Sequence, residues 1–104
     1  MKSFRIFIHT PEGCALDETA DALVIPGRRG RFGVLADHAP LIGAVVSGIL
    51  KLDRGGQSSF VVVGDGVVSV RQNEVTLLTD AAIRAATLAD AEEKLAEYGE
   101  DRRR

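Results

Sequence analysis

Glycine divides the first two-thirds of this chain into short apolar runs rich in β-branched residues. Eleven of its 104 residues are glycine, and a chain interrupted this often cannot build long helices there. Short β-branched runs between turn residues favour strands, and strands joined by tight turns pair antiparallel. The sequence therefore predicts a mostly β fold, a flattened antiparallel β-sandwich or barrel. Strands are expected at residues 4–9, 16–25 (one bent strand or two), 32–35, 41–46, 49–52, 60–63, 67–71 and 75–79.

The pattern changes after the last of these strands, where alanine becomes frequent. Apolar residues at helical spacing then share one face: Leu88, Ala91, Leu95 and Tyr98. Asp90, with Glu93 three residues on, predicts the N-terminal cap of a helix, and Gly99 predicts its end. We therefore expect a β-sandwich domain over residues 1–84 and a short helical segment with a charged tail over residues 85–104.

Composition argues against several classes of protein. The net charge is −2, whereas duplex-binding modules carry a basic face. One cysteine, Cys14, cannot form an internal disulfide, and this favours a reducing compartment. No signal peptide is apparent, and no apolar run approaches the roughly 20 residues that a membrane-spanning helix needs. We expect a cytoplasmic chain that reaches membranes only through partners.

The residue pattern offers little chemistry. Asp37 and His38 are the only neighbouring carboxylate and imidazole, and adjacent strand residues point to opposite faces. His9, His38 and Cys14 do not have the spacing of a metal site. We therefore expect no catalytic, cofactor-binding or metal-binding residues. An enzyme with a dispersed site is the weakest alternative, and it needs a pocket that joins His38 to a second titratable group.

Several predicted strands are apolar on both faces, at residues 44–46, 60–63 and 67–68. One short helix cannot cover both outer faces of a sandwich. Exposed apolar surface of this kind marks a protein contact, but tighter closure of a barrel explains the same pattern. Both interpretations stay open here. The arginines at 28, 29 and 31 similarly fit either a solvated loop or a contact with an acidic partner.

The block from Gly30 to Leu41, with the letters GRFGVLADHAPL, resembles the epsilon subunit of F-type rotary ATP synthases. The similarity spans most of the first 84 residues. Further segments that carry it are Thr10–Glu12, Val24–Gly27, Ser47–Leu50, Gly64–Val68 and Asn73–Leu78. The resemblance implies a β-sandwich followed by a helical part, without catalytic residues or a cofactor.

The resemblance also implies a place in the central stalk, the rotor that couples proton or sodium translocation to ATP synthesis. The chain would link the gamma subunit to the ring of c subunits, peripheral on the inner face of the cell membrane. The c-ring side would be formed by Arg29, Gly30, Arg31 and Phe32. The gamma side would be formed by His38, Ala39, Pro40, Leu41 and Ile42.

The sequence departs from this family in three places. One helix fits before Arg104, where the family has a helical hairpin that can block ATP hydrolysis, so weak or no inhibition is expected. The ATP-binding motif of some relatives is poorly matched at residues 88–92, so no ATP binding is expected. Arg31 stands where the family often has an acidic residue, and at a wet rim such a pair is worth only ~0–1 kcal/mol.

The main alternative is a generic small β-barrel module that binds peptides or oligonucleotides. An oligonucleotide-binding surface needs exposed aromatic rings interleaved with basic residues. The chain has no tryptophan, and its aromatic residues stand mostly at core-like positions: Phe4, Phe7, Phe32, Phe60 and Tyr98.

Overall fold

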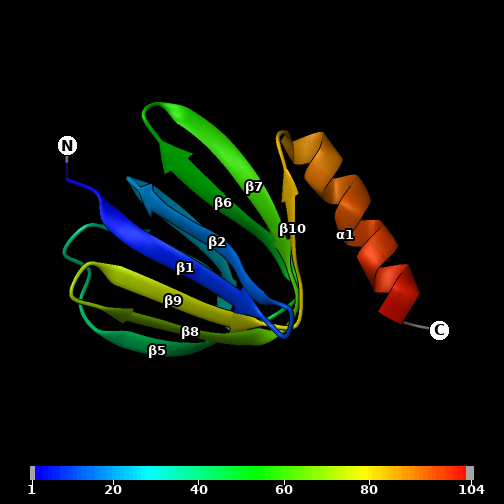
Figure 1. Cartoon of the computed structure of the whole chain (residues 1–104), viewed down its shortest axis with the longest axis horizontal. Coiled ribbons are helices and arrows are strands. Elements are labelled where there is room, and N and C mark those ends of the chain that lie inside the picture. Colours follow the sequence, from blue (N-terminus) through cyan, green and yellow to red (C-terminus); the bar gives the residue numbers. More distant parts are fainter. Residues whose placement is uncertain (1, 103–104) are drawn as a thin grey trace.

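The computed structural model describes residues 2–102 and forms, within them, ten β-strands and one α-helix (Figure 1). The elements are β1 (Phe4–Thr10), β2 (Gly13–Ala20), β3 (Ala22–Gly27), β4 (Gly30–Leu35), β5 (Leu41–Val45), β6 (Gly48–Arg54), β7 (Gln57–Val63), β8 (Gly66–Arg71), β9 (Glu74–Thr79), β10 (Ala82–Ala85) and α1 (Leu88–Arg102). The predicted β-sandwich or barrel with a C-terminal helix is confirmed.

The strands form one strongly curved sheet. Its order is β10-β7-β6-β3-β5-β8-β9-β1-β2, and β4 pairs with β3 outside this path. Most neighbours are antiparallel, as predicted, but β1 and β9 pair in parallel. These two strands are far apart in the sequence, so no hairpin turn sets their relative direction. The chain returns to β1 only with β9, and β10 follows it (Figure 1).

Alternation within the strands places the core. Phe4, Ile6 and Ile8 point inward from β1, and each is at most 3% exposed. They join the inward residues of the other strands in one large cluster. A second, smaller cluster lies outside the barrel, between β7, β10 and α1, and is built on Val62, Ala85 and Ala91. The two clusters explain how residues 61–63 are all buried, since alternate residues enter different clusters.

Strand β10 is absent from the sequence-based prediction. Its four residues pair antiparallel with β7, from Ala82 opposite Val63 to Ala85 opposite Phe60. Alanine has low β-propensity, and only the long-range ladder to β7 makes this segment a strand. The expected domain boundary at 84/85 stays a prediction; β10 ends at Ala85 and α1 begins at Leu88.

Both predicted ends of the helix are wrong. The cap is Thr87, whose Oγ1 accepts a bond from Asp90 N at 3.1 Å, while its carbonyl accepts from Ala91 N at 3.0 Å. Asp90 lies inside the first turn and pairs with Lys94 at 2.8 Å. The helix also continues through Gly99 to Arg102. The last residues of the predicted charged tail, 103–104, lie outside the described range.

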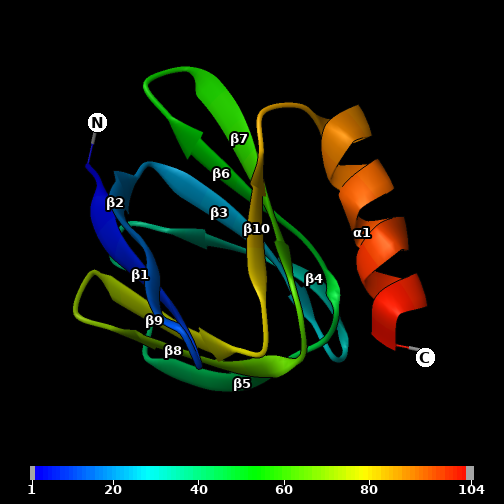
Figure 2. The same ribbon diagram turned by 45° about the vertical axis from the view of Figure 1, so that its right-hand side comes forward.

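The helix covers the outer face of β7 and β10 (Figure 2). Ala91 is fully buried there, and Leu95 packs against the same small cluster with Ile49 and Phe60. Leu88, predicted to belong to the buried stripe, is 51% exposed. Leu88 is the first residue of α1 and lines an open hollow beside Ile49 and Phe60. The stripe is therefore confirmed only in part.

Candidate functional site

The residues predicted to bind partners lie at opposite ends of the barrel. Successive strands reverse direction, so the turn at Arg28–Arg29 lies at one end and the loop from Ala36 to Pro40 at the other. Hydrogen bonds between loops support this placement. At the end that carries the Arg28–Arg29 turn, Ser47 N donates to Asp65 Oδ1 at 3.0 Å. At the end that carries the Ala36–Pro40 loop, Asp37 N donates to Asn73 Oδ1 at 2.6 Å.

The four residues from Arg29 to Phe32 differ in how far they are exposed to a partner. Arg29 and Gly30 are exposed at the tip of the β3–β4 hairpin, where Gly30 has a φ of 123° that favours glycine. Arg31 reaches back to the barrel, and its Nη1 donates to Ile49 O at 2.8 Å. Phe32 is half-buried against the main core. Arg29 and Gly30 are thus the members most available to a partner at this end.

The five residues from His38 to Ile42 also differ in exposure. His38 Nδ1 lies 2.6 Å from Ala39 O, and His38 N donates to Leu35 O at 3.2 Å, so this loop is bonded to itself. Leu41 packs against the main core. Ile42, by contrast, is 78% exposed and points outward from β5.

Ile42 belongs to an apolar surface that we call the open face: the outer side of β5, β8, β9 and β1. Val67 and Leu78 lie beside each other on it and are 49% and 55% exposed. Cross-strand partners extend this pair into a row, Ala44–Val67–Leu78–His9. A second row runs Ile42–Ser69–Thr76–Phe7. The rows place apolar groups from four strands on one surface.

One edge of the open face is charged and ordered. The Arg5 guanidinium lies 4.7 Å from the centroid of the Phe7 ring, and Phe7 stacks on His9 with ring centroids 6.2 Å apart. Arg5 also donates to Asp17 at 3.0 Å, and this hydrogen bond is the main reason that the pKa of Arg5 lies above its ordinary value. An apolar centre with a polar, charged rim is the usual anatomy of a protein–protein contact.

The outer faces of the doubly apolar strands differ in what covers them. At β7 the extra apolar residue, Val62, is covered by α1. At β8 and β9 nothing in the described part of the chain covers Val67 and Leu78. Sequence reasoning singled out Val67 but missed Leu78. The available signal was the adjacent pair Leu77–Leu78, since only one member can face the core.

Residues 2–102 contain no group of three or more potential metal-ligating side chains. No helix among them is long and apolar enough to cross a membrane.

The family described as "ATP synthase, Delta/Epsilon chain, beta-sandwich domain" matches residues 3–85. The ATP synthase epsilon chain of Pelotomaculum thermopropionicum is 43% identical over 84 residues, which are 81% of this chain and 63% of that protein. The epsilon chain of Rhodopseudomonas palustris (strain BisB5) is 38% identical over 88 residues, 85% of this chain and 65% of that one. The chain thus spans less than two-thirds of the length of these relatives.

Solved structures give the same fold. A chain in the Euglena gracilis mitochondrial ATP synthase structure of OSCP, F1 and c-ring superposes with a TM-score of 0.74 and 27% identity, covering 94% of this chain and 62% of that one. A chain of the Tetrahymena thermophila mitochondrial ATP synthase central stalk and c-ring superposes with a TM-score of 0.65 over 94% of this chain and 90% of that one. At 12% identity, the second likeness shows the fold alone.

Proposed function

Because this chain belongs to the ATP synthase delta/epsilon chain family, we propose that it is a non-catalytic subunit of the central stalk of an F-type ATP synthase. In this role it links the gamma subunit to the c-ring and turns with them, coupling proton or sodium translocation to ATP synthesis. It is peripheral at the inner face of the cell membrane and binds no nucleic acid.

The observation that carries this proposal is the open face. Its exposed apolar residues, Ile42, Val67 and Leu78, lie on three adjacent strands of a continuous ladder. Contiguous apolar surface on a folded domain usually serves a protein contact. We assign this surface to the gamma subunit, since Ile42 belongs to the stretch that the family resemblance places near the stalk.

The c-ring contact lies at the end of the barrel that carries the β3–β4 hairpin. Arg29 and Gly30 form its exposed tip, and Arg31 holds the hairpin against β6 through Ile49 O at 2.8 Å. A hairpin fixed in this way presents Arg29 in a defined direction. Arg31 therefore supports the contact from behind, which explains how a basic residue is tolerated where the family often has an acidic one.

The barrel suits a part that transmits torque. Seven of the ten strands described have neighbours on both sides, and one cluster of buried residues packs between them. Close-packed interiors have low compressibility and transmit strain. The contribution of this chain is therefore mechanical.

We further propose that helix α1 of this chain inhibits ATP hydrolysis weakly or not at all. The helix is held against the barrel at two points. Lys94 Nζ donates to Arg84 O at 3.3 Å, and Arg102 lies 3.7 Å from Asp65. ATPase rates of a complex reconstituted with and without this chain test the proposal, and a severalfold lower rate with the chain would contradict it.

The primary test is calorimetric titration with the gamma subunit of the same organism. We expect saturable one-to-one binding. Val67→Asp should weaken the affinity for gamma at least about tenfold, because the new carboxylate would be buried without a partner in the contact. Gln57→Asp, an exposed change on β7 away from the open face, is the matched control. Absence of binding at high micromolar concentrations, with both proteins folded, would overturn the stalk assignment. Equal affinity of the wild type, Val67→Asp and Gln57→Asp for gamma would overturn the assignment of the open face.

The c-ring contact is tested separately. A preformed complex with gamma should bind purified c-ring in detergent, and Arg29→Glu should weaken that binding while leaving the affinity for gamma unchanged. If Arg29→Glu has no effect on c-ring binding, the hairpin is not the contact.

A further inference from the structure

Strands β2 and β10 end the strand order of the curved sheet, and each has an unpaired edge, as β4 has elsewhere in the sheet. β2 pairs only with β1, and β10 only with β7. The free edges of β2 and β10 face each other across a hollow that both strands line. No ladder joins them within residues 2–102. Their connection is one ion pair, from Arg84 Nη1 to Glu18 Oε2 at 2.8 Å. We call the space between β2 and β10 the seam.

The free edge of β10 can be derived from its register. Gly64 N donates to Ala81 O at 3.2 Å, which makes this pair a hydrogen-bonded one. Hydrogen-bonded and non-bonded pairs alternate along an antiparallel ladder. Ala82 and Arg84 therefore turn their main-chain groups away from β7 and toward the seam. The contact of Lys94 Nζ with Arg84 O agrees, since that carbonyl is not used by the ladder.

The same reasoning gives the free edge of β2. Arg5 N donates to Asn73 O at 2.9 Å, so residue 5 of β1 faces β9. Residues 4, 6 and 8 then face β2 and bond to its residues 20, 18 and 16. Asp17 and Thr19 are left with main-chain groups directed toward the seam. Unpaired donors and acceptors in such a row are a template for a further strand.

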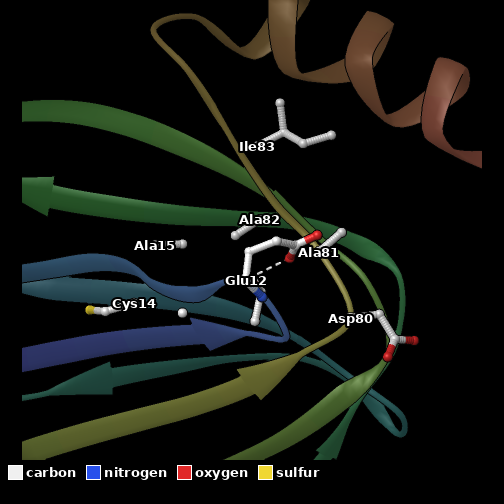
Figure 3. A pocket seen from close by; sticks show the side chains of 9 residues that line it. Glu12, Cys14, Ala15, Asp80, Ala81, Ala82 and Ile83 are labelled. Carbon is white, nitrogen blue, oxygen red and sulfur yellow. Dashed lines mark hydrogen bonds between the residues drawn. The ribbon is translucent and has the colours of Figure 1, made fainter.

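A hollow at one end of the seam leaves room beside these edges (Figure 3). Much of its wall consists of small side chains from the two facing strands: Cys14, Ala15, Ala81 and Ala82. Glu12 and Asp80 also line it, and no basic residue does. The charge of this hollow therefore favours a basic group. Farther along the seam, beside Leu16, a second hollow is lined by Arg84, Lys94 and Asp90, so the preference for a basic group holds at the first hollow.

The seam is continuous with the open face. Thr10 and Asp80 line this hollow and also a second one, whose other walls include Val67 and Leu78. A protein that covers Val67 and Leu78 thus reaches the seam around the end of β1 without leaving the surface. The Arg84–Glu18 pair lies beside this route. Its Arg84 side chain is 59% exposed and its Glu18 side chain 26%, so a partner can displace Arg84 at a modest cost.

We propose that the seam accepts an extended segment of the protein that docks on the open face, as a strand added along the free edges of β2 and β10, with a basic side chain in the hollow lined by Glu12 and Asp80. This inference rests on the proposed function, with the gamma subunit as that protein. Because β2 and β10 both start from the same end of the barrel, a strand running the opposite way pairs antiparallel with both.

Hydrogen exchange tests this placement directly on the wild-type chain. In the complex with gamma, we expect slower exchange of amides in β2 and β10 as well as on the open face. Cys14, which is exposed beside the seam, should also react more slowly with a thiol reagent. If gamma binds but exchange in β2 and β10 and the reactivity of Cys14 are unchanged, the seam proposal is wrong while the stalk assignment stands. If gamma does not bind, the stalk assignment itself fails.

Proline provides a matched pair of variants. Ala82→Pro removes an amide that points into the seam and no ladder bond to β7, so the fold should persist. We expect it to weaken gamma binding about tenfold through lost strand pairing. Gly33→Pro places proline on the free edge of β4, away from the seam, and should bind like the wild type. Equal binding by Ala82→Pro, with thermal unfolding showing that it is folded, would overturn the proposal.

Charge provides a second test of the occupant. Glu12→Lys reverses one of the two acidic groups of the hollow and should weaken gamma binding severalfold at low salt, with a smaller loss at high salt. If Glu12→Lys binds gamma as tightly as the wild type or more tightly, no basic side chain of the segment lies in this hollow.

Discussion

At the scale of single residues, the loop before β5 is held by a small polar cluster. Lys2 Nζ donates to Asp37 Oδ2 at 2.7 Å, and Asn73 Nδ2 donates to Asp37 Oδ1 at 3.0 Å. Asp37 has a φ of 64°, which aspartate and asparagine tolerate better than most residues. The bond from Lys2, then that from Asn73, holds the pKa of Asp37 below its ordinary 3.8.

This pKa predicts an acid-dependent part of stability. A carboxyl whose pKa is lowered on folding contributes stability above its unfolded pKa and loses it as pH falls through the folded value. The wild type should therefore lose stability below about pH 3.8 partly through Asp37. Asparagine also tolerates a positive φ but carries no charge. The urea midpoint of Asp37→Asn should therefore fall less than that of the wild type between pH 5 and about pH 2. Equal losses in both proteins would contradict this role.

Gly66 is a residue whose lack of a side chain is needed for packing. A Cβ at this position would overlap the carbonyl oxygen of Leu78 and lie 2.9 Å from Thr79 Cα, both on the paired strand β9. Backbone atoms of a paired strand cannot move aside cheaply. Gly66→Ala should lower the free energy of unfolding by roughly 2–4 kcal/mol in urea titration. A loss below about 0.5 kcal/mol would mean that the ladder adjusts freely.

At the scale of elements, α1 carries a glycine in its interior. Gly99 lies before the last residues of the helix, and a Cβ there would meet nothing within 4 Å. Glycine in a helix costs about 0.5–1 kcal/mol relative to alanine. Gly99→Ala should therefore raise stability by roughly this amount, seen as a higher thermal midpoint and more helical circular dichroism. A loss of stability would show that Gly99 ends the helix after all, as the sequence pattern first suggested.

At the scale of the whole molecule, the helix closes the outer side of β7 and β10. Removing it, in a fragment of residues 1–86, exposes the small cluster around Val62, Ala85 and Phe60. The main core does not depend on these contacts. We expect a folded β-barrel that is less stable than the full chain by roughly 2–4 kcal/mol and binds more of a hydrophobic dye. An unfolded fragment would show that residues 1–84 are not an independent domain.

Local patterns in the sequence determined most of the strands. Alternation at Phe4, Ile6 and Ile8 fixes which face of β1 is buried, since side chains in a strand point to opposite sides. The segment Asp53–Gly56 ends in two glycines, as is typical of a hairpin turn, and Gly55 and Gly56 adopt positive φ values of 59° and 80° there. These signals are carried by neighbouring residues and do not depend on the rest of the chain.

The tertiary structure decided what depends on distant residues. β10 is a strand because β7 lies beside it, and Thr87 caps the helix because β10 ends at Ala85. Among the residues predicted to bind partners, Ile42 is exposed, whereas Phe32 and Leu41 pack against the core. Whether an apolar strand residue is core or contact surface depends on what covers it: α1 covers Val62, and no described element covers Val67. That covering is set by long-range packing, which a local pattern of residues does not encode.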